Sequence, residues 1–296
     1  MIHYKSCPLC GSEKLSAWLV CHDNLLSNKE FALVRCPECG FILTQDPPEE
    51  NMIASYYQAD EYISHNPEAR GILSAVYRIA RDFMMMRKRR HLEIASGIKK
   101  GSLLDIGCGT GHFANTMKKA GWQVMGIEPG EKARNYAARE FGLKVLPPDK
   151  ISELPDQSFD FVTMWHVMEH FHDPFGYTSE VRRLLKPGGL WLTALPNSSS
   201  FDATFYLQNW AAWDVPRHLW HFNPGTLAKF ADKAGFRIIG TGVLPFDVFY
   251  ISILSEKARG TSLPFIKGFF KGLWFSARTL FDKSKSSSLY YLLKPR

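Results

Sequence analysis

Long uninterrupted hydrophobic runs are missing from this 296-residue sequence. A membrane-spanning helix needs roughly 18 to 20 consecutive apolar residues, and no stretch approaches that length. The apolar core of a signal peptide is also missing, because Met1 to Lys5 lead directly into cysteines. These absences predict a cytoplasmic protein without a spanning helix.

Cysteine is scarce, and neither sign of charge dominates. Four of the six cysteines stand in two C-x-x-C pairs, which favours a metal in a reducing compartment over a disulfide framework. The formal net charge of +7 suits nucleic acid, an anionic membrane or a phosphorylated substrate, and it does not choose among them. The length predicts one catalytic domain plus a smaller module, and 45% hydrophobic residues provide ample material for a core.

Two cysteine knuckles are the first motif in the chain: Cys7 with Cys10, and Cys36 with Cys39. Each knuckle places two thiolates on a tight turn, and four thiolates complete a tetrahedral zinc site with no position left for water, so the site is structural. A segment of about 45 residues has a small core, and a closed zinc site supplies roughly 10–16 kcal/mol of binding free energy that becomes folding free energy. Residues 1–45 are therefore predicted to form a zinc ribbon.

The sequence is organised around an apolar run at residues 103–106, which is followed by Gly107, Gly109 and Gly111. The run predicts a buried strand, the alternating glycines predict a tight turn, and residues 112–120 can form a helix. A strand, a glycine turn and a helix N-terminus in this order present backbone N–H groups to a small polar ligand. The spacing differs from the G-x-G-x-x-G dinucleotide fingerprint, which places its last glycine one residue later.

The second half of this site follows one strand later. Residues 122–127 form another apolar run that ends at Glu128, where a carboxylate can accept hydrogen bonds from both hydroxyls of a ribose. The glycine turn together with this acid resembles the class I S-adenosylmethionine-dependent methyltransferases. The resemblance covers about residues 101–255 and is extended by three later stretches: Phe159 to Val162, Glu169 with His170, and Leu185 to Gly189.

The resemblance implies an α/β fold with a Rossmann-like seven-stranded sheet, completed by an antiparallel hairpin at residues 236–243 and 248–254. It also implies S-adenosylmethionine as the cofactor. Asp149 falls where these enzymes commonly hold the adenine, and His166 falls in the turn that faces the cofactor. The predicted cofactor-binding residues are Asp105, Gly107, Cys108, Gly109, Gly111, Glu128, Asp149 and His166.

Histidines are the predicted catalytic residues. A hydroxyl acceptor has to lose a proton, for which a positioned histidine contributes about 10²–10⁴-fold in rate. His170 follows the predicted strand at 159–165, and ligands of open parallel sheets bind outside the carboxyl ends of the strands. Its alternative is a helix-capping or core hydrogen bond with Glu169. His218 and His221 lie in a later aromatic segment, and the sequence does not rank the three histidines.

The aromatic segment spans about 25 residues after the fifth predicted strand, and a loop this long is uncommon in a compact domain unless it works as a lid or binding loop. Aromatic rings stack on sugar faces, and charged groups pair with hydroxyls and phosphates. Trp213, Asp214 and Arg217 are therefore predicted to bind the acceptor, with a purely structural aromatic cluster as the alternative. In the linker, Tyr57 and Tyr62 are predicted to pack between ribbon and domain or to form a lid.

Four regions are predicted: a zinc ribbon at 1–45, a linker and helices at 46–98, the methyltransferase domain at 99–255 and a basic amphipathic tail at 256–296. In the tail, one helix face carries Phe and Trp side chains, and another carries Lys267, Lys271 and Arg278. Such a helix can make peripheral contact with a membrane, or its apolar face can pack on the catalytic domain or a second subunit.

Three functions compete. The leading one is methyl transfer to a small-molecule acceptor such as a nucleotide- or lipid-linked sugar, because the four-cysteine module and the aromatic segment are similar to methyltransferases of sugar and surface-polysaccharide pathways. O-, N- and C-methylation stay open. The second is an RNA base methyltransferase, but no base-flipping N-P-P-Y segment follows the fourth strand, so nucleic acid is not the expected partner. The third is a non-enzymatic zinc-binding adaptor, which the intact cofactor turn disfavours.

Overall fold

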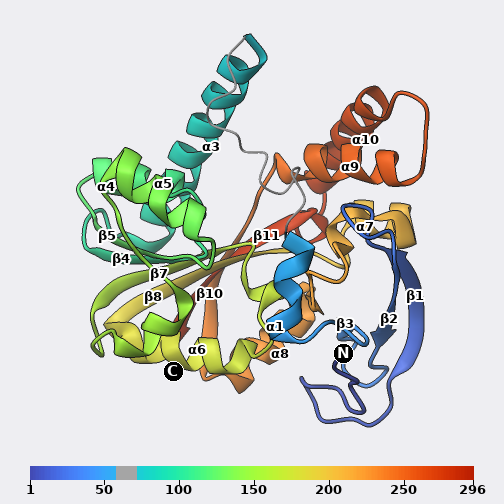
Figure 1. Cartoon of the computed structure of the whole chain (residues 1–296), viewed down its shortest axis with the longest axis horizontal. Coiled ribbons are helices and arrows are strands. Elements are labelled where there is room, and N and C mark those ends of the chain that lie inside the picture. Colours follow the sequence, from blue (N-terminus) through green and yellow to red (C-terminus); the bar gives the residue numbers. More distant parts are fainter. Residues whose placement is uncertain (58–71) are drawn as a thin grey trace.

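The computed structural model describes residues 1–57 and 72–296, so the role predicted for Tyr62 lies outside the described residues. Its main sheet contains β4 (Ser102–Ile106), β5 (Gln123–Ile127), β6 (Lys144–Leu146), β7 (Phe159–Trp165), β8 (Leu185–Pro196), β10 (Phe236–Val243) and β11 (Ser288–Pro295). The strand order is β10-β11-β8-β7-β4-β5-β6 (Figure 1). This order confirms the predicted α/β class with a seven-stranded Rossmann-like sheet.

Alternate residues of the central strands face two helical layers. Leu103 and Phe161 pack in one core cluster with α3 (Ile72–Ser96) and α4 (His112–Lys119), whereas Leu104 and Val162 pack with α6 (Pro174–Leu184) and α8 (Pro224–Lys233). Strands buried on both faces in this way read as continuous apolar runs. The other helices are α1 (Glu50–Ile53), α5 (Glu131–Phe141), α7 (Phe201–Tyr206), α9 (Asp247–Ala258) and α10 (Pro264–Thr279).

Helix starts follow local capping chemistry. At α8, the Asn223 side chain accepts from the backbone N–H of Thr226 at 2.9 Å, and the Thr226 hydroxyl oxygen accepts from the backbone N–H of Asn223 at 2.9 Å. Pro224 then occupies the first helical position, where no backbone N–H is needed. Within the described ranges, none of the helices combines the length and the hydrophobicity that a membrane crossing requires.

The closing edge of the sheet differs from the prediction. Residues 248–254 lie in α9 rather than in a strand, and the closing strand is β11, which lies between β10 and β8 and is antiparallel to both. The structure thus corrects the boundary predicted at residue 255, because the catalytic sheet uses the end of the predicted tail. Short apolar runs do not distinguish a strand from a buried helix segment. The residues buried in α9 follow helical spacing: Val248, Ile251, Ser252 and Ser255.

The N-terminal module shares a second sheet with the catalytic domain. Its strands β1 (Ser16–His22), β2 (Glu30–Arg35) and β3 (Ile42–Thr44) are continued by β9 (Trp220–His221), which belongs to the aromatic segment. β3 and β9 pair antiparallel, with Leu43 opposite Trp220. The module is therefore built into the catalytic domain and is not joined to it by the linker alone.

A buried arginine reinforces this junction. Arg217 is 1% exposed, and its Nη2 lies 2.8 Å from Asp23 Oδ1 of the module and 2.6 Å from Asp214 Oδ1. Its Nη1 also donates to the carbonyl oxygen of Tyr56 at 3.2 Å. Burial raises the pKa of Asp23, but hydrogen bonds from Ser27 and Arg217 outweigh it and hold the pKa below its ordinary value. Because an unpaired buried charge is costly, this network fixes the module in place.

We expect Asp23→Ala to lower the free energy of unfolding by about 3–5 kcal/mol, because the buried Arg217 charge loses a partner. Asp23→Asn, which keeps an accepting oxygen for Ser27 but removes the charge, should lose most of the same stability. Urea-induced unfolding followed by tryptophan fluorescence measures both changes. Lys14→Ala is the matched control, since the Lys14–Glu38 pair is exposed and such pairs contribute little. Equal stability of the Asp23 variants and this control would show that the buried pair does not hold the module.

Candidate functional site

The cofactor turn joins β4 to α4 and takes its shape from three glycines. Gly107, Gly109 and Gly111 have φ values of 70°, 54° and 79°, in the left-handed region that favours glycine. The backbone N–H of Gly107 donates to the carbonyl oxygen of Ile127 at 2.7 Å, so the turn is tied to the end of β5. The N-terminus of α4 is thereby held beside the end of the neighbouring strand.

Close packing adds a second requirement for glycine. A β-carbon at Gly107 would lie 2.4 Å from Cγ2 of Val167, and one at Gly111 would lie 2.8 Å from Cδ1 of Leu143. A β-carbon at Gly109 would meet no atom of the described residues within 4 Å. Gly107 and Gly111 therefore let the surrounding elements approach, while Gly109 borders the space where a ligand can lie.

Glu128 stands directly after β5, next to this turn. Its Oε2 accepts the backbone N–H of Gly109 at 2.9 Å, and its Oε1 accepts that of Gly130 at 2.8 Å. Burial raises the pKa of Glu128 above its ordinary value, although these two hydrogen bonds oppose the shift. Each carboxylate oxygen has a second lone pair, so Glu128 can hold the turn and still accept hydrogen bonds from ribose hydroxyls.

Asp105, Cys108 and Asp149 occupy different environments. Asp105 is buried in β4, where it accepts a hydrogen bond from the hydroxyl of Thr163 at 2.7 Å, and burial raises its pKa to about 7. Asp105 therefore supports the site by linking β4 to β7. Cys108 packs close to Gly126, where a β-carbon would lie 2.5 Å from the Cys108 sulfur. Asp149 is exposed in a 3₁₀ helix at Pro148–Glu153.

The turn after β7 begins with His166, whose φ is 57°. Its Nε2 lies 3.0 Å from Oδ2 of Asp247, the first residue of α9, and its Nδ1 lies 3.6 Å from Oε1 of Glu169. Burial lowers the pKa of His166, but the two carboxylates outweigh this effect and raise the pKa to about 9. His166 is therefore a cation at neutral pH that ties the turn to α9.

His170 and His218 form a second cluster at the end of the same turn. Their ring centroids lie 4.6 Å apart. Nδ1 of His170 lies 3.1 Å from the carbonyl oxygen of Arg217, and Nδ1 of His218 lies 2.9 Å from that of Ala212. A carbonyl can only accept, so a proton on Nδ1 satisfies this contact in each neutral ring and leaves the lone pair on Nε2. In His170 the hydroxyl of Tyr57, 2.9 Å from Nδ1, can instead donate to that atom in the other tautomer. Burial lowers the pKa of His170 to about 4, which keeps this imidazole neutral.

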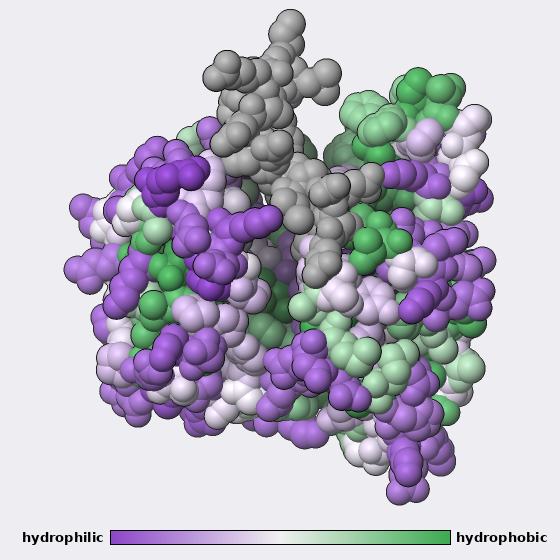
Figure 2. All heavy atoms as spheres, viewed as in Figure 1, coloured by the Kyte–Doolittle hydropathy of each residue, from purple (hydrophilic) through white to green (hydrophobic). Residues whose placement is uncertain are grey.

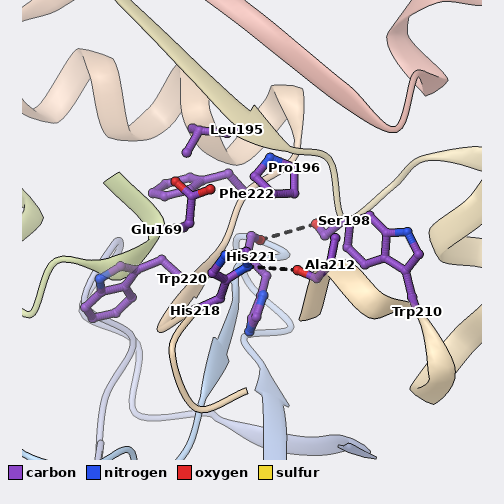
Figure 3. A pocket seen from close by; sticks show the side chains of 10 residues that line it. All are labelled: Glu169, Leu195, Pro196, Ser198, Trp210, Ala212, His218, Trp220, His221 and Phe222. Carbon is purple, nitrogen blue, oxygen red and sulfur yellow. Dashed lines mark hydrogen bonds between the residues drawn. The ribbon is translucent and has the colours of Figure 1, made fainter. Parts of the chain in front are cut away.

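Glu169 completes the cluster and is 1% exposed. Neither of its carboxylate oxygens has a hydrogen-bond partner among the described residues. Its side chain lines a small pocket together with His218, Trp220 and Phe222 (Figure 3). One ligand atom each from Glu169, His170 and His218 lies within 4.8 Å of the others, and this donor set can hold a divalent metal.

The aromatic segment builds structure where acceptor contacts were predicted. Trp213 is buried and packs edge-on against Trp18 and Trp210, with ring centroids 5.3 Å and 4.8 Å apart. His221 is also buried, and its Nε2 lies 3.0 Å from the hydroxyl oxygen of Thr44. These placements favour the structural alternative for Trp213 and His221, because aromatic residues of a core and of a ligand surface look alike in a sequence.

Asp214 and Arg217 are committed to the junction with the module rather than to an open surface. Arg217 is enclosed by its two carboxylates, so its predicted contact with an acceptor is corrected to a structural role. Asp214 keeps 22% of its side chain exposed, and its Oδ2 lies 3.8 Å from Nε2 of His218.

Three side chains at the site were not predicted to belong to it. The hydroxyl of Tyr57 lies 2.9 Å from Nδ1 of His170, and Asp247 pairs with His166. Lys88 of α3 places Nζ 4.3 Å from the ring centroid of Trp165, and burial lowers its pKa. All three come from segments outside the motif, and Tyr57 had been predicted to pack between ribbon and domain or to form a lid.

The four predicted zinc ligands converge in the module. The sulfur atoms of Cys7 and Cys39 are 3.5 Å apart, those of Cys10 and Cys36 are 3.6 Å apart, and all four lie within 4.8 Å of one another. Sulfurs about 2.3 Å from a tetrahedral zinc ion are separated by about 3.8 Å, so this set fits the ion.

The sheet order, the glycine turn and the acid after β5 together define a class I S-adenosylmethionine-dependent methyltransferase. A family described as "Methyltransferase domain" matches residues 78–241, more than half of the chain, and the chain belongs to this family. The predicted enzymatic class and the predicted cofactor are thereby confirmed.

Relatives and a solved structure agree with this assignment. The chain is 26% identical over 174 residues to the ubiquinone biosynthesis O-methyltransferase of Idiomarina loihiensis, which covers 54% of this chain and 72% of that protein. It is 28% identical over 144 residues to a "Probable S-adenosylmethionine-dependent methyltransferase" of Mycolicibacterium smegmatis, spanning 47% of this chain and about half, 53%, of that protein. Magnesium protoporphyrin IX methyltransferase of Synechocystis PCC 6803 with bound SAH shares the fold, with a TM-score of 0.54 at 14% identity over 84% of this chain and 100% of that one.

We expect Glu128→Ala to weaken S-adenosylmethionine binding by about 1.5–3 kcal/mol, the contribution of hydrogen bonds to a charged group. Isothermal titration calorimetry measures the affinity, and thermal melting shows whether the turn at Gly109 still folds. Glu131→Ala, an exposed acid in the first turn of α5, is the matched control. Wild-type affinity in a folded Glu128→Ala variant would remove Glu128 from the cofactor site.

Proposed function

We propose that the chain transfers a methyl group to a hydroxyl of a small-molecule acceptor, with His170 as the general base. The observation that supports this proposal is an imidazole held neutral in the turn after β7, within 4.8 Å of the buried carboxylate of Glu169. This turn packs against the cofactor turn, because the side chain of Val167 fills the space beside Gly107. The proton acceptor and the cofactor turn thus lie at the same edge of the sheet.

When bound, S-adenosylmethionine supplies a methyl group on a positively charged sulfur, and this sulfur is the leaving group that a nucleophile displaces directly. The glycine turn and Glu128 orient the cofactor, and orientation of two reactants is worth roughly 7–11 kcal/mol of barrier. Nε2 of His170 would take the hydroxyl proton of the acceptor. The buried carboxylate of Glu169 favours the imidazolium that results, whereas His218 disfavours it.

The acceptor we propose is a cytoplasmic ring compound with a free hydroxyl, for which a nucleotide- or lipid-linked sugar is the leading candidate. Trp210, Trp220 and Phe222 line the small pocket beside Glu169, but each of them is at most 4% exposed, so a ring acceptor has to bind outside this pocket. The name of the Idiomarina relative specifies O-methylation, which supports oxygen as the acceptor atom.

His170→Asn should lower kcat by about 10²–10⁴-fold and leave cofactor affinity near wild type, because it removes only the proton acceptor. In the wild-type enzyme, the pKa of about 4 predicts that kcat/KM stays level as the pH falls through 6.5 and declines only toward pH 4. Methyl transfer to a panel of nucleotide sugars and phenols, followed over this pH range, measures both effects.

His172→Asn, on the same turn but directed to the carbonyl oxygen of Pro48, is the matched control and should keep wild-type turnover. A fall in kcat/KM centred near pH 6.5, or normal turnover of His170→Asn, would exclude His170 as the base.

We also propose that Cys7, Cys10, Cys36 and Cys39 bind one structural zinc ion. Elemental analysis of the purified chain should give about one zinc per chain, which Cys36→Ser loses and Cys21→Ala, a buried thiol outside the cluster, retains. Because β9 continues the sheet of the module, a strong chelator should also disturb the aromatic segment and shift its tryptophan fluorescence. A metal-free chain with a folded module would contradict the proposal.

A further inference from the structure

The α9–α10 hairpin projects from the sheet edge that carries the catalytic turns (Figure 1). It follows β10, and β10 runs parallel to β8 because both are antiparallel to β11. The hairpin therefore begins at the carboxyl ends of the parallel strands, at the same edge of the sheet as the cofactor turn. The ion pair between Asp247 of α9 and His166 ties its base to the site.

One face of α10 is used for packing inside the molecule, and it is a face of glycines. A β-carbon at Gly268 would lie 2.4 Å from Cα of Ile253, and one at Gly272 would lie 2.6 Å from Cδ1 of Phe249, so the helices approach closely. Phe275 is the large side chain buried on this face. The predicted packing of the aromatic face is confirmed in part: Phe269 contacts Phe249 of α9 and Trp274 contacts Phe205 of α7, with ring centroids 5.6 Å and 5.8 Å apart.

The aromatic face of α10 remains exposed. Phe265 is 73% and Phe281 is 94% exposed, and hydrophobic surface gathers over this end of the molecule (Figure 2). Contiguous apolar patches of this kind mark interaction surfaces, whereas isolated exposed residues do not. The exposed apolar residues of the segment are Leu263, Phe265, Ile266, Phe269, Phe270, Leu273, Trp274, Leu280 and Phe281.

The charge around this patch is mainly positive. Between residues 264 and 281 the sequence holds three basic residues and no acidic one. Nζ of Lys271 lies 4.9 Å from the ring centroid of Trp274, and the guanidinium of Arg278 lies 5.3 Å from the same centroid, so cations stand beside the exposed rings. Asp282 follows, and then Lys283 and Lys285. A binding partner for this face has to be apolar and anionic.

We propose that the exposed face of α10 binds an anionic lipid membrane. Aromatic and aliphatic side chains enter the interfacial region, and Lys267, Lys271 and Arg278 meet the lipid phosphates. A second copy of the chain is a poorer partner, because a two-fold interface pairs the same patch with itself and would set these cations against one another without an acid between them. The use of this contact rests on the proposed function: the site would face a membrane that carries a lipid-linked acceptor.

The test is co-sedimentation of the full chain with vesicles of phosphatidylcholine alone and of phosphatidylcholine mixed with phosphatidylglycerol. We expect the protein to pellet with the anionic vesicles, and less so as salt is raised. Phe270→Glu and Trp274→Glu should each weaken this binding by about tenfold or more, since each removes a large apolar group from the interface. Lys267→Glu with Lys271→Glu should abolish the preference for phosphatidylglycerol.

Ile94→Glu, an exposed apolar residue of α3, is the matched control and should pellet like wild type. Calorimetry with S-adenosylmethionine should give wild-type affinity for every variant, which shows that they fold. Vesicle binding is measured without an acceptor, so it tests the membrane proposal independently of the proposed methyl transfer. The proposal is overturned if the wild-type protein stays in the supernatant, or if the α10 variants pellet as well as the wild type. A dimer in sedimentation analysis that these substitutions dissociate would assign the face to a second copy.

Discussion

The guanidinium of Arg217 is the contact on which the rest of the molecule depends. It is buried between Asp23 of the module and Asp214 of the catalytic domain, and the same residue presents its carbonyl oxygen to Nδ1 of His170. One residue thus secures the junction and contacts the proposed base. A module that begins far from the cofactor turn in sequence therefore has a direct physical connection to the chemistry.

Neighbouring charges hold two buried histidines of one turn in different states. His166 lies between two carboxylates and is held as a cation, with a pKa of about 9. His170, four residues later, lies among carbonyl and aromatic groups and is held neutral, with a pKa of about 4. Environments that push two pKa values apart in this way separate a structural ion pair from a proton acceptor. Glu169 serves both, because it faces His166 on one side and the pair of His170 and His218 on the other.

The parts of the fold that could be predicted are those encoded locally. The strand, glycine turn and helix around Gly107, and the acid after β5, follow from short-range periodicity and from the conformations that only glycine adopts freely. The strand predicted at residues 248–254 was wrong because a short apolar run fits a strand and a helix equally well. Burial favours core roles for Trp213 and His221, and a sequence pattern does not tell an aromatic core from a binding surface. Tyr57, Lys88 and Asp247 reach the site through contacts between distant segments, for which the sequence carries no local signal.

The position of β11 has a consequence for how the protein is made. Ser288–Pro295 follow both β8 and β10 in the chain, yet they fill the gap between these strands and pair with both. The ribosome therefore delivers both neighbouring strands before it delivers the strand that joins them. The catalytic sheet closes only after β11 has been delivered, and until then the edges of β8 and β10 that β11 will occupy are open to a chaperone or a second nascent chain.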